Sequence, residues 1–587
     1  MQNSPDILSL ISPFFLLLLL FGVGSRFSLP GEQSKVILHF RIAIGYGLFF
    51  ILYNLLVPFL APFALHVTLW VILLLFAVIN SKHILQSIKA FKFKLNFEYL
   101  FFIALFIPHI FRVLSPPTSD DGPSFYLPNI QWIYFNGLSF NPYQTAYTTM
   151  PLGAEELFSM VYPYGGYYSV RILDALFCLL LFDLLYDFVV KFIGKNLSRS
   201  FLILILLLPG TFFFLFGTGK VDVLNTYFMT LGFVLFLKYW NTKNLPLVIV
   251  VFSLSLSIKY TSWLLLAVPL FLLCAAYIYQ NAKRNFWIFF VPLFFVAPTL
   301  IKNQVQVNNP LASIFNSPNQ TQFIWKKGSL PERGGISKIA VSKNKSSQLR
   351  AFLKTIQDLT IPILLVFVII IGLLQFLNKI QIPQLWLWML FLFSSFSLWF
   401  YFLGTSPQPM RFAWLQVIIC LILIGKSVDF ILTKYFANSA KVISTVLFAV
   451  LFASISYKIV FRHGYQIPAF FKAQKMELSD WYLENQKDHY GFSVAFKEGG
   501  FHYKDVAYLT HVAKGFFDVG DYGNIPTDLE YHRIKKNYPK AIAAHRYLLC
   551  TKKQRAIKNL DKYSIIIQKG NYFLLDKQLQ PDKNEAD

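Results

Sequence analysis

Two adjacent carboxylates stand in a short turn directly after a long apolar run. The stretch Ser115 to Pro128 reads SPPTSDDGPSFYLP, and it follows FEYLFFIALFIPHIFRVL, which is apolar enough to lie in hydrocarbon. Asp120 and Asp121 are therefore expected at the end of a membrane span. A carboxylate there can serve as a general base if a hydroxyl lies within hydrogen-bond reach. Capping of the next helix, or an Asx turn with Gly122, explains the pair equally well when it is taken alone.

Four cations occupy the same kind of position, at the ends of apolar segments. A charge toward the membrane centre costs at least about 2.5 kcal/mol, so it is normally kept for a partner. Snorkelling, or local pairing of an Arg with Asp174 and of a Lys with Asp222, is one explanation. For the whole set we favour a shared anionic ligand. The four cations are Arg171, Lys220, Lys259 and Arg411.

The segment after the Asp pair predicts two short helices. FYLPNIQWIYFNGLSF has apolar residues at helical spacing, and Asn136-Gly137 marks the end of that helix. Pro151 stands near the start of a second helix that carries Glu155 and Glu156. Both helices are expected to lie in the membrane interface with their acids at the outer surface. Such a surface suits a reaction between a lipid-linked substrate and an acceptor from the aqueous side.

Composition places the chain among polytopic membrane proteins. Of its 587 residues, 56% are hydrophobic and 14% are charged. The net charge of +24 is better explained by basic loops and contact with anionic membrane lipids than by nucleic acid, because no basic, aromatic-interleaved module is present. The first apolar run begins at Ile7 without a basic leader or a cleavage site, so it is expected to be a retained span.

Hydropathy predicts about 13–14 transmembrane helices. The stretch 245–279 is too long for one span and short for two, and orientation decides it. With the amino terminus outside, the basic short connections fall inside only if this stretch is a hairpin. The expected spans are 7–24, 36–58, 62–80, 98–114, 169–190, 200–217, 220–240, 245–258, 260–279, 286–301, 360–378, 384–403, 411–432 and 441–461.

The same orientation divides the chain into three parts. Residues 1–97 form amino-terminal transmembrane helices, and residues 98–461 form a transmembrane module with outer loops 115–168 and 302–359. The tail 462–587 mixes helical stretches with strand-like ones such as YSIIIQKGNYFLLD, so it is expected to be a small soluble α/β domain on the outer face.

The order of these motifs resembles the GT-C superfamily of integral membrane glycosyltransferases, especially bacterial members related to the protein mannosyltransferase and aminoarabinose transferase group. The resemblance covers roughly residues 98 to 435. Phe125-Tyr126 stands where the family has Tyr-His. The matching parts are Asp121, FYLP at 125–128, PLGAE at 151–155, Arg171, Pro209 with Asp222, Lys259-Tyr260, Asn309-Pro310 and Arg411-Phe412.

The resemblance implies an all-α polytopic fold and an inverting transfer of a sugar from a polyprenyl-phosphate donor to a glycan, lipid or protein acceptor. Asp121 would be the catalytic base. Lys220, Lys259 and Arg411 would hold the leaving lipid phosphate, where charge grows in the transition state. The other substrate-binding candidates are Asp120, Tyr126, Glu155, Arg171 and Asp222.

The implied location is the bacterial inner membrane, with the catalytic loops and the tail on the periplasmic side. Asp120, Asp222 and the two glutamates carry the oxygen ligands that a divalent cation would need, although the resemblance requires no metal.

Two other functions stay open. A transporter or flippase of a lipid-linked or anionic solute would also use intramembrane charges such as Asp183, Asp187 and Arg171, and a broken hairpin at 245–279. It should carry such charges near the midplane and on both faces. A non-catalytic GT-C-like protein of envelope glycan assembly would explain why Tyr126 replaces a histidine.

Overall fold

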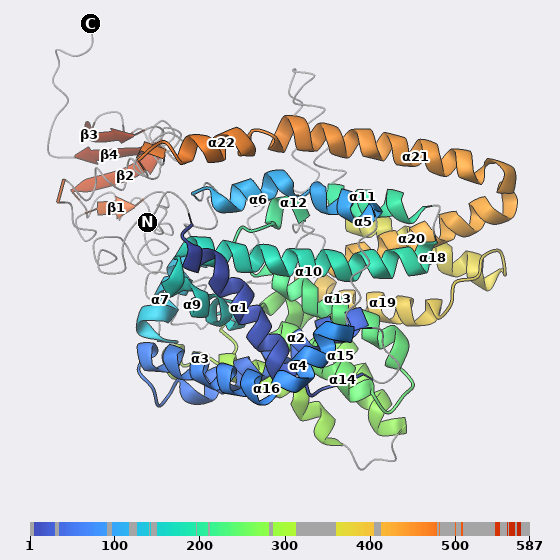
Figure 1. Ribbon diagram of the computed structural model, residues 1–587, viewed down its shortest axis with the longest axis horizontal. Helices are drawn as coiled ribbons and strands as arrows, with labels where there is room; N and C mark the ends of the chain where they lie inside the picture. The colour runs from blue at the N-terminus through green and yellow to red at the C-terminus, as the bar shows by residue number, and fades with distance from the viewer. Residues whose placement is uncertain are drawn as a thin grey trace, which may run out of the picture.

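The protein is a long bundle of helices with a small sheet near one end (Figure 1). The computed structural model describes residues 5–29, 34–90, 97–116, 126–139, 141, 149–194, 197–208, 212–280, 286–312, 360–403, 413–477, 480–481, 499–500, 506–508, 546–551, 560, 563–569 and 572–576. Asp120, Asp121, Phe125, Pro209 and Arg411 lie outside these residues.

The helices follow the predicted spans closely. They are α1 (Ile7–Gly24), α2 (Ser34–Leu56), α3 (Pro62–Ile79), α4 (Ser81–Ala90), α5 (Phe97–Ala104), α6 (Ile107–Leu114), α7 (Leu127–Asn136), α9 (Gly153–Val161), α10 (Tyr167–Ile193), α11 (Ser198–Leu207), α12 (Phe212–Leu215), α13 (Asp222–Tyr239), α14 (Leu245–Leu254), α15 (Tyr260–Gln280), α16 (Phe290–Val307), α18 (Thr360–Phe376), α19 (Leu385–Leu403), α20 (Trp414–Tyr435), α21 (Ala437–Tyr457) and α22 (Gln466–Ala473).

Two predicted spans are broken. The span 98–114 is divided into α5 and α6, and Pro108 lies in the first turn of α6, where its missing N–H is tolerated. The span 200–217 is divided into α11 and α12. The stretch 245–279 is interrupted after the 3₁₀ turn η3 (Ser255–Ser257), and α14 packs on α15, as the hairpin interpretation requires.

The chain is a multi-pass membrane protein. Within the described residues, seven helical stretches are long and apolar enough to cross a bilayer, and shorter apolar helices accompany them. The helix α10 has the length of a span but carries five charged residues, which are considered below. The stretch Ala437–Ala473 joins α21, the π-helical turn η7 (Lys458–His463) and α22 into 37 helical residues. It measures about 55 Å and therefore exceeds the hydrocarbon thickness of a membrane.

One end of the bundle gathers the polar segments. In Figure 1 the short helices α7 and α9, the start of α10 and the carboxyl-terminal sheet all lie toward the end of the molecule where α22 emerges. That the loop 115–168 and the tail share one face of the membrane stays a prediction. The figure assigns no cellular side to that face.

The tail contains a four-stranded sheet. Its strands β1 (Val506–Tyr508), β2 (Tyr547–Thr551), β3 (Ser564–Lys569) and β4 (Tyr572–Asp576) are arranged in the order β1-β2-β4-β3. Strand β1 runs parallel to β2, and the other pairs are antiparallel. The strands β3 and β4 confirm the strand prediction for YSIIIQKGNYFLLD.

The two helices after the Asp pair form as predicted, but α9 is buried within the bundle. The helix α7 ends at Asn136, and Gly137 follows with a φ of 64°, which confirms the predicted stop. Every residue of α9 is buried, and α9 packs against α1, α2, α7 and α10. The expectation that Glu155 and Glu156 lie at the outer surface is therefore wrong, because neighbouring helices cover both sides of α9.

Candidate functional site

The site is organised around the first turn of α9. Gly153 begins this helix, and a Cβ there would lie 2.5 Å from the hydroxyl of Tyr46 and 2.7 Å from the carbonyl oxygen of Ser257. Glycine thus allows α9 to press against α2 and the break after α14. As a result Glu155 and Glu156 enter the bundle, where their exposed fractions are 4% and 3%.

A buried ion pair lies beside this turn. The Nζ of Lys259, at the start of α15, donates to Oδ1 of Asp222, the first residue of α13. Both side chains are almost fully enclosed, with 8% and 1% exposed. The second oxygen of Asp222 has no hydrogen-bond partner among the described residues. The pair joins two residues that were predicted to bind substrate, and it excludes neither role.

The glutamates and the ion pair form one electrostatic cluster with Lys302. Burial raises the pKa of Glu155 to about 7, against the opposing influence of Lys302 and Lys259, while Asp222 raises it further. Burial also raises the pKa of Glu156 to about 8, which the charge of Lys302 and a hydrogen bond from Asn54 partly offset. One or both carboxyls therefore carry a proton near neutral pH.

The two glutamates differ in their partners. The Nδ2 of Asn54 donates to Oε2 of Glu156 over 3.0 Å. Oε2 of Glu155 is buried and has no hydrogen-bond partner among the described residues. Lys302 on α16 donates to the carbonyl oxygen of Met150 at 2.9 Å, just before α9. Of the two glutamates, Glu155 is thus the one with an oxygen that can accept a further hydrogen bond. Lys302 holds the backbone at Met150, directly before the helix α9 that carries Glu155.

The described hydrogen bonds of Arg171 go to backbone carbonyl oxygens and not to a carboxylate. Its Nε donates to the carbonyl oxygen of Gly217 at 2.9 Å, and its terminal nitrogens donate to the carbonyl oxygens of Arg112 and Ser115. These contacts fix the end of α6, directly before the segment with Asp120 and Asp121. The structure therefore gives Arg171 a positioning role at this end of the segment.

The turn before Lys220 is held just as firmly. Asp174 accepts hydrogen bonds from the backbone N–H of Thr218 and of Gly219 at 2.9 and 3.0 Å, and Tyr167 donates to the carbonyl oxygen of Thr218 at 2.7 Å. Lys220 is 1% exposed, and its Nζ lies 4.5 Å from the ring centre of Phe214. The local pairs considered from the sequence are therefore not the contacts described. Arg171 and Asp174 each bond to backbone, Lys220 lies against Phe214, and Asp222 pairs with Lys259.

The acidic segment 117–125 begins and ends at this same site. Ser115 on one side is held by Arg171, and on the other side the buried Tyr126 leads into α7, which packs on α9. Both flanking residues therefore lie at the end of the bundle that carries the cluster, whereas Asp120 and Asp121 themselves lie outside the described residues. Among the described residues, no group of three or more His, Cys, Asp or Glu side chains is arranged to hold a metal ion.

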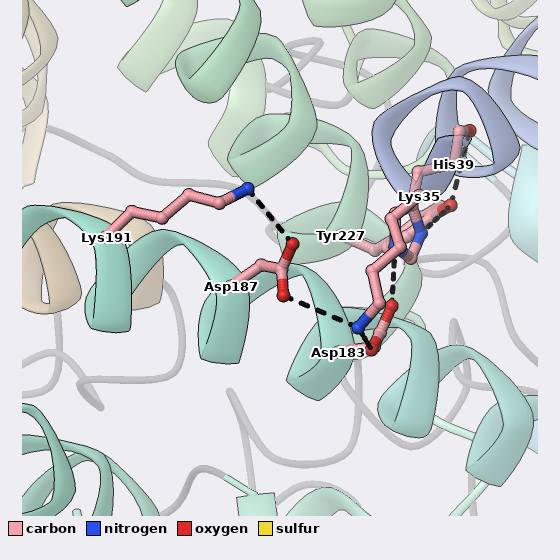
Figure 2. Close-up of polar contacts among 6 residues, drawn as sticks. All are labelled: Lys35, His39, Asp183, Asp187, Lys191 and Tyr227. Atoms are coloured by element: carbon pink, nitrogen blue, oxygen red, sulfur yellow. Dashed lines mark hydrogen bonds and ion pairs between the residues drawn. The ribbon is translucent and has the colours of Figure 1, made fainter. Parts of the chain in front are cut away.

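A second charged cluster lies farther along α10 (Figure 2). The Nζ of Lys35 lies 3.1 Å from Oδ1 of Asp183 and 3.4 Å from Oδ1 of Asp187. The ring of His39 lies 3.2 Å from the other oxygen of Asp183 and 3.1 Å from the hydroxyl of Tyr227. Asp183 follows Arg171 by twelve residues, so the clusters are separated by about 18 Å along the helix.

The sequence reasoning missed the bases Lys302, Lys35 and His39, together with the polar partners Asn54 and Tyr227. Lys302 stands one residue beyond the predicted span 286–301, and as a fifth cation at an outer helix end it had the same signal as the other four. Lys35 gave no such signal, because a Lys at the inner end of a helix agrees with the rule that basic residues lie on the inner side of a membrane. His39 gave none either. Only the packing of α2 against α10 reveals their partners.

Searches against models of protein families, against curated proteins and against solved structures give no match for this chain.

Proposed function

We propose that this protein is a membrane glycosyltransferase of the GT-C type, which moves a sugar from a polyprenyl-phosphate donor to an acceptor at the outer, periplasmic face of a bacterial inner membrane. The observation that carries the proposal is the buried cluster of Glu155, Asp222, Lys259 and Lys302. It lies at the end of the bundle where the acidic segment 117–125 begins and ends. Acids and cations from separate helices converge there, as a polar substrate beside a lipid phosphate requires.

In this proposal Asp121 removes a proton from the acceptor hydroxyl as its oxygen attacks the anomeric carbon. The bond from that carbon to the lipid phosphate breaks, and the phosphate leaves with the electron pair. Lys220, Lys259 and Arg411 stabilise the charge that grows on the phosphate. An Arg can hold two phosphate oxygens at once, whereas a Lys acts as a point charge.

The remaining candidates position these groups. Oε2 of Glu155 has no hydrogen-bond partner among the described residues, so it is suited to accept a hydrogen bond from a sugar hydroxyl. Arg171 fixes the residue before the acidic segment, and Asp222 orients Lys259. Asp120 directly precedes the base, and Tyr126 directly follows the segment 117–125.

A transporter or flippase remains the second candidate, and the cluster in Figure 2 favours it. Lys35, His39, Asp183 and Tyr227 place charge and polarity inside the bundle, well away from α9. A transporter was expected to carry charges on both faces. Under the glycosyltransferase proposal the same residues bind α2 and α13 to α10.

One reconstitution experiment separates the two. The full chain is placed in sealed vesicles with a panel of polyprenyl-phosphate hexoses, and both release of polyprenyl phosphate and movement of intact donor across the bilayer are measured. The proposal predicts release, together with at least a tenfold loss in Glu155→Gln. The matched variant Glu156→Gln should retain release, because Glu156 contacts Asn54. Movement of intact donor without cleavage would replace the proposal with the transporter.

A further inference from the structure

The motif Asn309-Pro310, directly after α16, has no part in the proposed mechanism. Asn308 ends the helix in the left-handed conformation, with a φ of 52°. The side-chain oxygen of Asn309 then accepts the backbone N–H of Leu311 at 3.1 Å, which closes an Asx turn. The turn brings the carbonyl oxygen of Pro310 back toward Asn303, near the end of α16. The chain therefore folds back onto its own helix at this motif.

Asn303 contacts two of the sequence motifs at once. Its Nδ2 donates to the carbonyl oxygen of Thr149 over 2.8 Å and to that of Pro310 over 3.4 Å. The side chain is fully buried. Both acceptors are carbonyl oxygens, so only a group with two donor hydrogens can serve them together, and a side-chain amide is such a group. Asn303 therefore ties the Asn309-Pro310 turn to the residues directly before PLGAE at 151–155.

Two neighbouring side chains of α16 bond to the same connecting segment. Lys302 donates to the carbonyl oxygen of Met150 at 2.9 Å, and Nε2 of Gln306 donates to the carbonyl oxygen of Leu138. These two donors stand one helical turn apart, with the amide described above beside them, so all three lie on one side of α16. The segment 138–150 joins α7 to α9, and α16 thus holds both of its ends.

The backbone at Thr149 helps to determine where Glu155 lies. The first hydrogen bond of α9 runs from the N–H of Glu156 to the carbonyl oxygen of Leu152 over 2.8 Å, so the helix itself does not hold Thr149. Gly153 packs closely against α2 and the break after α14. The start of α9 is therefore fixed by α16 on the chain before it and by close packing at Gly153, two residues before Glu155.

We propose that Asn303 is a positioning residue of the glycosyltransferase, which holds the backbone at Thr149 and so directs Glu155 toward the donor sugar. The inference rests on the function proposed above. The Asn309-Pro310 motif supplies the second acceptor, which fixes the rotation of the Asn303 amide. A group that touches substrate keeps its geometry only when the side chains behind it are held in this way.

Release of polyprenyl phosphate tests this role in Asn303→Ala, beside the wild type, Glu155→Gln and the double variant. Asn303→Ala should lower kcat/KM at least about fivefold, the effect of one lost hydrogen bond. If Asn303 acts through Glu155, the double variant should lose no more than Glu155→Gln alone, because both changes disturb one interaction. Losses that multiply would overturn the proposal.

Asn80→Ala is the matched control. Asn80 is also a buried asparagine whose amide donates to a backbone carbonyl oxygen, that of Gly22, over 3.0 Å. It lies about 21 Å along α3 from His66, which contacts Ser159 of α9. Asn80→Ala should lose stability to a similar extent but keep the turnover of the wild type. An equal loss of turnover in both alanine variants would mean that Asn303 has only a structural role.

Hydrogen exchange of the full chain, followed by mass spectrometry, gives a readout that does not depend on activity. The N–H of Glu156 closes the first turn of α9, so its exchange reports how firmly that turn is held. It should exchange about fivefold faster in Asn303→Ala and at the wild-type rate in Asn80→Ala. Asn303→Asp, which keeps the shape of the side chain but replaces the donor with an acceptor, should show the same acceleration.

The two readouts separate this inference from the proposed function. Unchanged exchange at Glu156 in both Asn303 variants would refute the positioning role, whatever the turnover. A wild type that releases no polyprenyl phosphate would instead refute the proposed function, and the exchange rates alone would then confirm or reject Asn303 as the residue that positions the first turn of α9.

Discussion

Removal of the cation from the buried Asp222–Lys259 pair tests the architecture of the site. Lys259→Met keeps the length of the side chain but leaves the carboxylate of Asp222, which is 1% exposed, without that cation. Breaking a buried pair by removing one partner costs about 3–5 kcal/mol, because the remaining charge stays desolvated. We therefore expect Lys259→Met to lower the free energy of unfolding by that amount.

The chain offers a matched control in Lys191→Met. Lys191 pairs with Asp187 over 3.2 Å, but 53% of its side chain is exposed. An exposed pair contributes about 0–1 kcal/mol, so this variant should be nearly neutral. The double variant Asp222→Asn with Lys259→Met should cost about 1–3 kcal/mol less than the sum of the single variants, because they share one interaction.

Unfolding in mixed micelles with increasing dodecyl sulfate, followed by far-ultraviolet circular dichroism, gives these free energies. All four variants are compared in the same detergent and at the same pH. Equal losses for Lys259→Met and Lys191→Met, or strictly additive effects of the Asp222 and Lys259 changes, would refute the inference that this pair is buried and mutually dependent.

Three further outcomes follow from the same helices. Because burial raises the pKa of Glu156 from 4.5 to about 8, its contribution to stability is full below pH 4.5 and is lost as the pH rises to 8. Melting at pH 5 and pH 8 should show this loss, on the order of 3–5 kcal/mol, and Glu156→Gln should reduce it. Gly153→Ala should destabilise the protein by about 1–3 kcal/mol in the same melts, because the new methyl meets Tyr46 and Ser257. Arg171→Lys should cost about 1–3 kcal/mol and slow donor turnover, since the three carbonyls are bonded by three different guanidinium nitrogens and a single ammonium nitrogen cannot occupy all three positions.

Each of these outcomes has a comparison. Gly372→Ala should be milder than Gly153→Ala, because its new methyl meets only the flexible end of Met389. An unchanged pH dependence in Glu156→Gln would mean that another group titrates. If Arg171→Lys kept the turnover and the stability of the wild type, the positioning role inferred for Arg171 would be contradicted.

Helices were predictable because each apolar run is long and each break has a local cause. Gly137 ends α7 where the sequence placed the stop, and the helix breaks before Lys259, as the charge balance of the loops required. The strands β3 and β4 were equally visible, since runs of six and five residues of strand type stand close together in the sequence. All of these signals lie within a few residues of the feature that they predict.

Pairings and burial were harder, because they depend on residues far apart in the chain. Lys259 and Asp222 are separated by 37 positions, and each was predicted to contact a ligand rather than the other. The burial of Glu155 depends on helices packed around α9, which no local pattern reveals. His39 and Asp183 are 144 positions apart, and only the fold unites them.

The central claim is that Asp121 acts as general base in the transfer of a sugar from a lipid phosphate. The most direct measurement is the rate of polyprenyl phosphate release by Asp121→Asn, beside Asp120→Asn and the wild type, each at equal level and with unchanged melting. A positioned base contributes about 10²–10⁴-fold, so Asp121→Asn should lose at least a hundredfold while Asp120→Asn loses far less. Wild-type turnover in Asp121→Asn would contradict the account.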